Sequence, residues 1–387
     1  MIIAGGIYKE SCVIPEWNAE YGSGGRAAAA VVALCPATIL HTYSRTPDSS
    51  GLESLRRLGV DVHVQPASHG VAFAYFHPLS HPHVEPPRSS IVQHPPIEVS
   101  GEAVLRFGIL EGDAIVRANR AVYDPQTSVR PAEFLANGSH AEELALVLNE
   151  GESRALTGNT DVRSAALTLL QPGGAAVVVV KAGARGALVA ERGGAMTEVP
   201  AYRSDRVFKI GTGDVFSSIF ALEWAERKLP PAVAAELASR SVAAYCSSGM
   251  LPLPTGAPAA REPIVLKRSP VVLLEGSTDT IGRRYVMEEA RYSLAELGAD
   301  VVCPVLDSTP AASPSISAAL VIADESRTAL QSRVQRMNNA GIPVVVLDEF
   351  HSKSATARKR ERPLLRITDD FASAIYFALW AASPQHD

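Results

Sequence analysis

The sequence predicts an α/β protein built on a largely parallel sheet with helices on both faces, followed by a second, smaller α/β unit. Short apolar runs alternate with helical runs from the N-terminus onward, which is the pattern of βαβ units. Several of these apolar runs end in glycine or polar residues, as strands do where a sheet faces a ligand. A proline-rich stretch, residues 251–258, interrupts the alternation, which then begins again.

The composition narrows the class of protein. A chain of 387 residues suits two domains, and 47% hydrophobic with 20% charged residues is an ordinary globular mixture. The net charge of −5 argues against a broad surface for nucleic acid or anionic membranes, so a phosphate site would have to be local. No apolar run approaches the ~20 residues of a membrane span, and the start lacks the basic region of a signal peptide. The four cysteines show no CxxC spacing. We therefore expect a cytoplasmic protein with no nucleic-acid and no membrane partner.

In the first unit, strands are predicted where apolar and β-branched residues cluster between glycine or polar breaks. These runs are Met1–Ile7, Ile39–Tyr43, Val60–Val64, Val71–Phe76, Ala114–Val116, Arg120–Tyr123, Leu144–Leu148, Ala176–Val180 and Ala187–Ala190. Helices are predicted where alanine, leucine and charged residues follow a glycine or capping residue. They are Ala27–Leu34, Gly51–Leu58, a helix beginning at Ser153–Thr157, Ser217–Arg227 and Ala232–Gly249.

Residues 66–98 break the alternation with seven prolines and a group of histidines. His77, His81, His83 and His94 with Glu85 suggest a metal site, but their spacing matches no established metal motif. Histidines are also common in proline-rich surface loops. We therefore favour a mobile flap beside the substrate.

Two strand ends carry residues suited to a nucleotide. Asn149 and Glu152 lie three apart where a strand passes into a helix, so both could face one pocket and support a hydrated Mg²⁺ with phosphates. The same spacing is also that of a capping box, and the sequence leaves both interpretations open. The next buried strand ends in Lys181-Ala-Gly183-Ala-Arg-Gly186, whose glycines would let a nucleotide lie close to the backbone.

The segment Lys209-Ile-Gly211-Thr212-Gly213-Asp214 opens a helical run. Its glycines let successive N–H groups point one way, and the partial positive charge of a helix N-terminus favours an anion. A carboxylate at this place suits a general base that takes a hydroxyl proton during phosphoryl transfer. An ordinary N-terminal turn, with Asp214 as a first-turn acid, is the alternative. Lys209 either points inward, where it would stabilise a transferring phosphoryl group, or faces solvent.

The second unit repeats the α/β pattern after the linker. Predicted strands are Val271–Leu274, Asp300–Cys303, Ala319–Ile322 and Pro343–Leu347, and predicted helices are Arg283–Leu297, Arg327–Ala340 and Phe371–Ala381. The basic stretch Lys353–Arg362 is interpreted as a solvated surface loop. The domains are thus placed at 1–256 and 270–387, with a linker at 257–269.

The ordered set of motifs resembles the ribokinase (PfkB-type) family of carbohydrate and nucleoside kinases over residues 1–256. The motifs that carry the resemblance are Gly5-Gly6, Gly24-Gly25, Asn149-x-x-Glu152, Lys181-x-Gly183-x-x-Gly186 and Gly211-Thr212-Gly213-Asp214. The resemblance implies a ribokinase-like three-layer α/β/α fold and an ATP- and Mg²⁺-dependent kinase. Its acceptor would be the hydroxyl of a nucleoside or sugar, and a homodimer is compatible with it.

The resemblance also implies a role for each motif. Asp214 would be the catalytic base and Gly211, Thr212 and Gly213 the anion hole, with Lys209 beside it. Asn149, Lys181, Gly183 and Gly186 would bind ATP, and Asn149 with Glu152 would organise Mg²⁺. Glu10, Gly24, Gly25 and Arg26 would meet the acceptor.

Three positions depart from the family pattern: Phe208-Lys209-Ile210 before the motif, Arg26 where sugar kinases usually have Asn, and Glu10 where they have Asp. Arg26 suits an acceptor that carries a carboxylate or phosphate, or else lies on the surface at the start of a helix. These departures also keep a second hypothesis open, a catalytically weak nucleotide- or nucleoside-binding sensor or scaffold.

Residues 271–382 resemble, more weakly, the nucleoside 2-deoxyribosyltransferase-like domains, which implies a Rossmann-like or flavodoxin-like fold. The motifs are Glu275-Gly276-Ser277, Gly298-Ala-Asp300 and Ala340-Gly-Ile-Pro343. Arg333 occupies the place of that family's nucleophilic Glu, so a ligand-sensing or assembly role is favoured over a glycosidic-bond enzyme.

Overall fold

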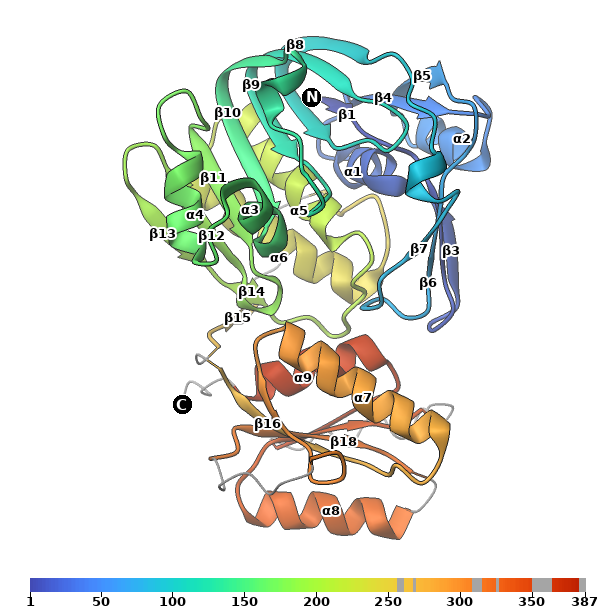
Figure 1. Ribbon diagram of the computed structural model, residues 1–387, viewed down its shortest axis with the longest axis vertical. Coiled ribbons are helices and arrows are strands. Elements are labelled where there is room, and N and C mark those ends of the chain that lie inside the picture. The colour runs from blue at the N-terminus through green and yellow to red at the C-terminus, as the bar shows by residue number, and fades with distance from the viewer. Residues whose placement is uncertain (256–260, 267–268, 308–314, 325–326, 350–363, 383–387) are drawn as a thin grey trace. The chain divides into compact units, whose positions relative to one another are not determined.

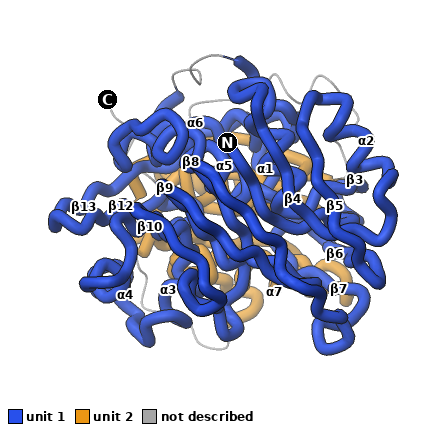
Figure 2. The backbone as a smooth tube through the Cα atoms, turned by 90° about the horizontal axis from the view of Figure 1, so that it is seen from above, with its two compact units in different colours: residues 1–263 blue, residues 264–387 orange. Residues whose placement is uncertain are grey.

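The computed structural model describes residues 1–255, 261–266, 269–307, 315–324, 327–349 and 364–382 (Figure 1). The chain divides into two compact units, 1–263 and 264–387, which Figure 2 distinguishes by colour. The predicted linker lies partly, and the basic stretch Lys353–Arg362 wholly, outside the described residues. Across the described residues, no helix combines the length and the apolar character needed to cross a membrane.

The first unit is built on a nine-stranded sheet in the order β13-β12-β11-β10-β9-β8-β1-β4-β5. Its strands are β1 (Ile2–Ala4), β4 (Ile39–Ser44), β5 (Asp61–Pro66), β8 (Ile97–Phe107), β9 (Ala114–Asp124), β10 (His140–Asn149), β11 (Val177–Lys181), β12 (Ala187–Glu191) and β13 (Met196–Val199). Neighbours from β5 to β11 pair in parallel, whereas β12 and β13 are antiparallel. This large parallel sheet confirms the predicted fold class.

Helices cover both faces of this sheet, as expected for strands that are apolar on both sides. They are α1 (Gly22–Val31), α2 (Ser50–Arg57), α3 (Glu150–Thr157), α4 (Val162–Leu169), α5 (Thr212–Ala221) and α6 (Pro231–Ser248). Side chains of α1, α2, α5 and α6 share one buried core with residues such as Val147 and Val179. The alternate residues, Leu148 and Val180 among them, form a second core with α4. The period of two along each strand therefore divides the core into two layers.

A second, four-stranded sheet stands beside the large one, in the order β3-β2-β6-β7. Its strands are β2 (Lys9–Cys12), β3 (Trp17–Glu20), β6 (Ala72–Tyr75) and β7 (His83–Glu85). The histidine-rich segment that we interpreted as a flap thus contributes two strands to a sheet. A short ribbon of β14 (Ala201–Tyr202) and β15 (Pro263–Ile264) completes the strands around this unit.

The structure differs from the sequence prediction at several boundaries. The two predicted strands at 114–116 and 120–123 are one strand, β9, because residues between them continue the ladder with β8 and β10. The strand β8 and the helix α4 were not predicted. The predicted helix 217–227 begins five residues earlier, at Thr212, and its last part, Leu222–Glu226, is a π-helix.

The second unit is a five-stranded parallel sheet in the order β17-β16-β18-β19-β20. Its strands are β16 (Val271–Glu275), β17 (Asp300–Val302), β18 (Ala318–Ile322), β19 (Val344–Leu347) and β20 (Leu365–Thr368). Its helices are α7 (Ile281–Glu296), α8 (Arg327–Asn339) and α9 (Phe371–Ala381), with α8 on the face of the sheet opposite α7 and α9 (Figure 1). Counted within the unit, the strand order is 2-1-3-4-5, which is the flavodoxin-like order of doubly wound sheets.

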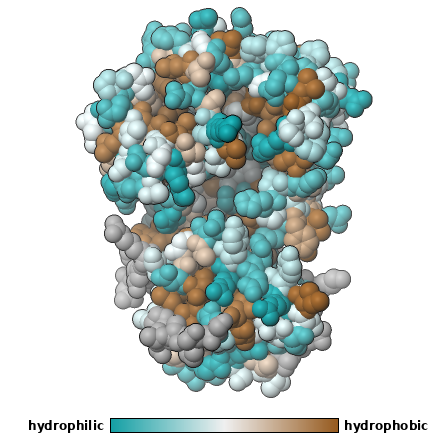
Figure 3. All heavy atoms as spheres, in the orientation of Figure 1, coloured by the Kyte–Doolittle hydropathy of each residue, from teal (hydrophilic) through white to brown (hydrophobic). Residues whose placement is uncertain are grey.

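On the face drawn in Figure 3, hydrophobic residues are scattered among polar ones in each unit. This mixed surface is usual, because apolar atoms supply about half of the accessible surface of folded proteins.

Candidate functional site

The carboxyl ends of three neighbouring strands place polar side chains at one edge of the large sheet. Asp124 is the last residue of β9, Asn149 the last of β10 and Lys181 the last of β11, and Asn149 pairs with Lys181 in the ladder. Helix α5 begins at this edge, because a Cβ built on Gly213 would lie 3.7 Å from Lys181 Nζ. Strand ends of this kind are where open α/β sheets bind ligands.

The N-terminus of α5 combines a left-handed glycine with a buried carboxylate. Gly211 caps the helix at φ 76°, and Asp214 lies in the first turn with 8% of its surface exposed. A side chain at position 211 would be strained at this φ and would also overlap Arg26, whose Nε would lie 2.0 Å from a Cβ there. The glycine is therefore required both by the turn and by its neighbour.

Arg26 connects the predicted base to the predicted acceptor carboxylate. Its Nη2 donates to Glu10 Oε2 at 2.6 Å, and its Nη1 donates to Glu10 Oε1 at 3.2 Å and to Asp214 Oδ2 at 2.9 Å. Only 1% of Arg26 is exposed, so the interpretation of a surface arginine is wrong. Burial alone would lower the pKa of Arg26, but the carboxylates outweigh it and raise that pKa, so the guanidinium stays charged.

The glycines that precede Arg26 allow α1 to approach the end of β1. A Cβ on Gly24 would lie 2.6 Å from the carbonyl oxygen of Gly5, and Gly24 N donates to the carbonyl of Gly6 at 3.0 Å. Gly25 has ordinary space around it, with a Cβ 3.5 Å from Leu55. The structure therefore gives Gly24 a packing role, whatever it contacts in a complex.

Lys181 lies in a buried network that the sequence did not reveal. Its Nζ is 2.6 Å from Asp124 Oδ2, and Ser217 of α5 donates to the same oxygen at 2.7 Å. Asp124 is 1% exposed, and its other oxygen, Oδ1, has no hydrogen-bond partner within the described residues. Burial lowers the pKa of Lys181, but Asp124 and then Glu152 raise it by more, so the ammonium is retained.

The second oxygen of the predicted base also has a partner. Gln126, two residues after Asp124, donates to Asp214 Oδ1 at 3.0 Å. Gln126 adopts a positive φ of 60°, which is uncommon outside glycine. The only sequence signal for these two residues was a strand that ends in Asp124-Pro125, and that signal also fits an ordinary turn.

Lys209 points toward the helix start. Its Nζ donates to Thr212 Oγ1 at 2.9 Å, and Thr212 Oγ1 in turn donates to the carbonyl of Lys209 at 3.0 Å. Burial and the nearby Lys181 lower the pKa of Lys209. Of the two orientations that the sequence left open for Lys209, the structure therefore contains the inward one.

Asn149 and Glu152 form a capping box at the start of α3. Asn149 Oδ1 accepts from Glu152 N, and Glu152 Oε2 accepts from Asn149 N, each at 2.8 Å. Burial first, and then the charge of Asp124, raise the pKa of Glu152 to about 7. Of the two interpretations that the sequence left open, the capping box is present. Glu152 is also close enough to Asp124 and Lys181 for their charges to affect its pKa.

The glycines after Lys181 adopt conformations that other residues avoid. Gly183 has φ 58° and Gly186 has φ 86°. A Cβ on Gly186 would lie 2.0 Å from the carbonyl oxygen of Val199, so this glycine is required by the close approach of β13.

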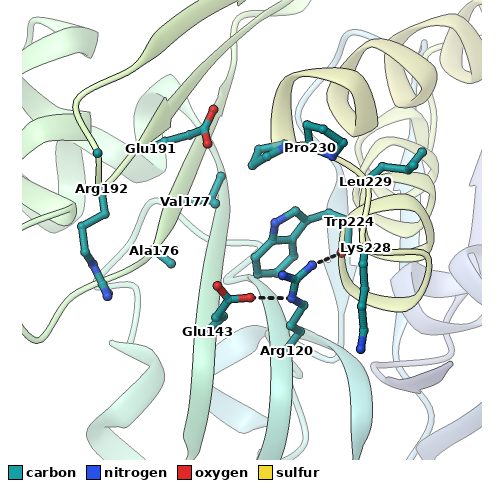
Figure 4. Close-up of a pocket in the computed structure, with 12 residues that line it drawn as sticks. Arg120, Glu143, Ala176, Val177, Glu191, Arg192, Trp224, Lys228, Leu229 and Pro230 are labelled. Carbon is teal, nitrogen blue, oxygen red and sulfur yellow. Dashed lines mark hydrogen bonds and ion pairs between the residues drawn. The ribbon is translucent and has the colours of Figure 1, made fainter.

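Two further regions lie outside this cluster. A cavity of about 430 Å³ opens at the opposite end of the strands, between the first residues of β10 and β11 and the segment after α5 (Figure 4). Arg120 in the wall of this cavity forms an ion pair with Glu143 at 2.5 Å and donates to the carbonyl of Trp224 at 2.8 Å.

Within the described residues, no group of three or more histidines, cysteines or acids has the geometry of a metal site, and this includes the histidine-rich segment.

In the second unit, acids at the strand ends are paired with arginines of α8. Arg336 donates to both oxygens of Glu275, at 2.6 and 2.8 Å, and Arg333 lies 3.3 Å from Asp324. Arg333, which we compared with that family's nucleophilic Glu, thus forms an ion pair with Asp324, and the role of the second unit stays a prediction. The resemblance of this unit to deoxyribosyltransferase-like domains stays a prediction.

Comparison with known proteins bears on the cluster at the N-terminus of α5. Residues 138–251, which contain the capping box, Lys181 and Asp214, match a family model described as pfkB family carbohydrate kinase. This segment is pfkB-like. The resemblance that the motifs predicted is confirmed for it. No curated protein matches the chain in sequence.

Several solved structures overlap the chain at low identity. A pyrophosphate-dependent kinase of the ribokinase family, complexed with a pyrophosphate analog and myo-inositol, is 18% identical, with 64% of this chain and 95% of that chain covered and a TM-score of 0.48. Ribokinase from Thermotoga maritima is 18% identical over 68% of this chain and 95% of its own, with a TM-score of 0.46. A Burkholderia thailandensis nucleoside kinase in complex with inosine is 16% identical over 63% and 89%, also with a TM-score of 0.46.

Proposed function

We propose that the first unit is an ATP-dependent phosphotransferase that phosphorylates a hydroxyl group of a sugar or nucleoside-like molecule. The observation that carries the proposal is the position of Asp214, a buried carboxylate in the first turn of α5, inside the pfkB-like segment. The backbone N–H groups of Gly211, Thr212 and Gly213 are the anion hole in this proposal, because the start of a helix presents donors without helical partners. The N–H of Thr212 donates to the carbonyl of Lys209 at 3.3 Å, so it would have to exchange that bond for the phosphate.

In the proposed reaction Asp214 is the general base. The acceptor hydroxyl gives its proton to Asp214 while its oxygen forms a bond to the γ-phosphorus, and the bond from that phosphorus to ADP breaks. A carboxylate has about four lone-pair sites, and Asp214 uses two of them for Arg26 and Gln126. It therefore keeps capacity for a hydroxyl.

Two lysines lie near the proposed anion hole. Lys181 is bound by Asp124, and Lys209 is bound by Thr212. Charges fixed in advance near a transferring phosphoryl group stabilise the transition state without reorganisation. Asp124 is thus a positioning residue for Lys181 in this proposal.

The residues at the strand ends also fit a magnesium ion carried by the nucleotide phosphates. Asp124 Oδ1 is a buried oxygen without a partner in the described part of the chain, and Glu152 lies near it. Mg²⁺ binds through one or two carboxylates and keeps several waters, which agrees with such a sparse donor set. Asp124 and Glu152 would hold it, and it would neutralise the phosphate charges.

A screen of sugars, polyols, sugar acids, sugar phosphates and nucleosides for ADP release tests the proposal. We expect transfer to at least one hydroxylated acceptor, at a rate well above ATP hydrolysis without acceptor. ATP binding with no transfer to any member of the panel would contradict it.

One observation favours the second hypothesis, a sensor or scaffold that binds nucleotide without efficient transfer. Both oxygens of Glu10 and one oxygen of Asp214 are bound to Arg26, so the groups expected to meet an acceptor are bound to each other. The same screen separates the hypotheses, because a sensor would bind ATP and release no acceptor-dependent ADP.

A further inference from the structure

The guanidinium of Arg26 fills the space between two carboxylates that come from distant parts of the chain. Glu10 lies on β2 and Asp214 on α5, and Arg26 on α1 contacts both at 2.6 and 2.9 Å. Its guanidinium carbon also lies 6.0 Å from the ring of Trp17 and 5.5 Å from that of Tyr21. The cation is therefore held from several sides.

A buried cation cannot simply leave such a place. Removing a charged partner from a buried pair leaves an uncompensated buried charge, which is strongly destabilising. A neutral sugar or nucleoside offers Arg26 no compensating charge, so it cannot take the place of Asp214 as a partner. A ligand with a carboxylate or phosphate can, and the planar fork of a guanidinium matches both groups.

One donor of Arg26 has no hydrogen bond in the described part of the chain, although the Tyr245 hydroxyl also interacts with the guanidinium. Nε is buried and has no hydrogen-bond partner within the described residues. It abuts the backbone of Gly211, at the start of α5. A buried N–H without a partner is costly, and an oxyanion beside Gly211 would satisfy it.

The charges around the site are close to balanced. Glu10, Asp214 and Asp124 supply three carboxylates and Arg26, Lys181 and Lys209 three cationic groups, and Glu152, whose pKa is raised to about 7, adds part of a fourth negative charge near Lys181. All seven side chains are buried or partly buried, so their charges are weakly screened. The start of α5 adds a partial positive charge.

We infer that Arg26 is a specificity-determining residue, which closes the acceptor subsite to neutral sugars and nucleosides and admits a hydroxylated acceptor that carries a carboxylate or phosphate. The anion takes over Nε and the hydrogen of Nη1 that serves Asp214, while Nη2 and the other hydrogen of Nη1 stay on Glu10. Asp214 Oδ2 is thereby freed from Arg26 and adds to the lone pairs that can accept the hydroxyl proton. This inference rests on the proposed function for the role of Asp214, but its test is a binding measurement.

The test compares matched acceptors that differ in one anionic group. Calorimetry measures the binding of glucose against gluconate, and of ribose against ribose 5-phosphate, to the full chain and to Arg26→Asn. We expect the wild-type protein to bind at least one anionic member ten-fold or more tightly than its neutral counterpart. We expect Arg26→Asn to abolish or reverse that preference.

Two further variants distinguish a loss of specificity from a loss of folding. Glu10→Gln combined with Arg26→Asn removes one of the carboxylates that the single variant leaves unpaired. Arg106→Asn is the matched control, because Arg106 is also 1% exposed and paired with a carboxylate, that of Asp113, outside this cluster. We expect Arg106→Asn to lower stability and leave the preference between acceptors unchanged.

Each outcome decides the inference. A wild-type protein that binds neutral acceptors as tightly as their anionic counterparts overturns it, and so does the absence of binding to every probe. A preference for the anion that survives Arg26→Asn overturns the role of Arg26. Selective anion binding without phosphoryl transfer supports the inference and contradicts the proposed kinase activity. Phosphoryl transfer to neutral acceptors by the wild type supports the kinase activity and contradicts the inference.

Discussion

Replacing Lys181 with Met isolates the buried pair that supports the proposed transfer site. Asp124 would lose its ammonium partner and keep only the hydroxyl of Ser217, in surroundings where 1% of its side chain is exposed. Breaking a buried pair by removing one partner costs about 3–5 kcal/mol, and the 16% exposure of Lys181 places the expected loss at the lower end. We expect the free energy of unfolding of this unit to fall by about 3 kcal/mol.

A double-variant cycle shows whether this loss belongs to the pair. Asp124→Asn combined with Lys181→Met leaves no uncompensated charge, so we expect the two losses to fall short of additivity by about 2 kcal/mol. Urea unfolding, followed by tryptophan fluorescence, measures the stability of the single and double variants. All of them carry Trp380→Phe, so that the signal comes only from the tryptophans of the first unit. Arg185→Met is the control, because its pair with Glu150 is 48% and 33% exposed and should contribute less than about 1 kcal/mol. Losses that add within about 0.5 kcal/mol would refute the reasoning.

Two more predictions address single ionisable groups. The pKa of Glu152 is raised to about 7 in the folded protein, above its unfolded value, so folding favours the protonated form and stability falls as pH rises between about 4.5 and 7. Glu152→Gln should therefore gain stability relative to wild type across that range, by up to about 3 kcal/mol at pH 8, and a stability difference that does not change with pH would contradict the assignment. Lys209→Ala should lower kcat more than it raises the KM for ATP, because a cation beside the anion hole acts most strongly in the transition state. Unchanged values of both in steady-state kinetics would show that Lys209 supports only Thr212.

The sequence was sufficient to predict which strand ends would meet. Asn149 and Lys181 each end an apolar run, and the carboxyl ends of parallel strands share one edge of a sheet, so their proximity follows from the alternation of strands and helices. The Gly211-to-Asp214 segment was correctly predicted to lead into a helix, although the predicted start at Ser217 lay five residues too late. The strand β8 was missed because Ser100-Gly101-Glu102 interrupts its apolar pattern.

The partners of the predicted residues could not be predicted in the same way. Arg26 and Asp214 are 188 residues apart, and no local pattern relates them. Asp124 and Gln126 flank a proline after a strand, which locally is typical of a turn. Only the packing of α1 and α5 against the sheet brings these side chains together, and that packing depends on the whole core.

The most direct test of the account is phosphoryl transfer by Asp214→Asn. Asparagine keeps the size of the side chain and an oxygen that can accept from Arg26, but it cannot take a proton. With the best acceptor from the screen, we predict that kcat falls by about 10²–10⁴ while ATP binding stays close to that of the wild type. The free energy of unfolding falls, because Arg26 loses one of its two charged partners, but Glu10 still pairs with it and the protein stays folded under the assay conditions. Turnover near that of the wild type in Asp214→Asn would contradict the assignment of Asp214 as the general base.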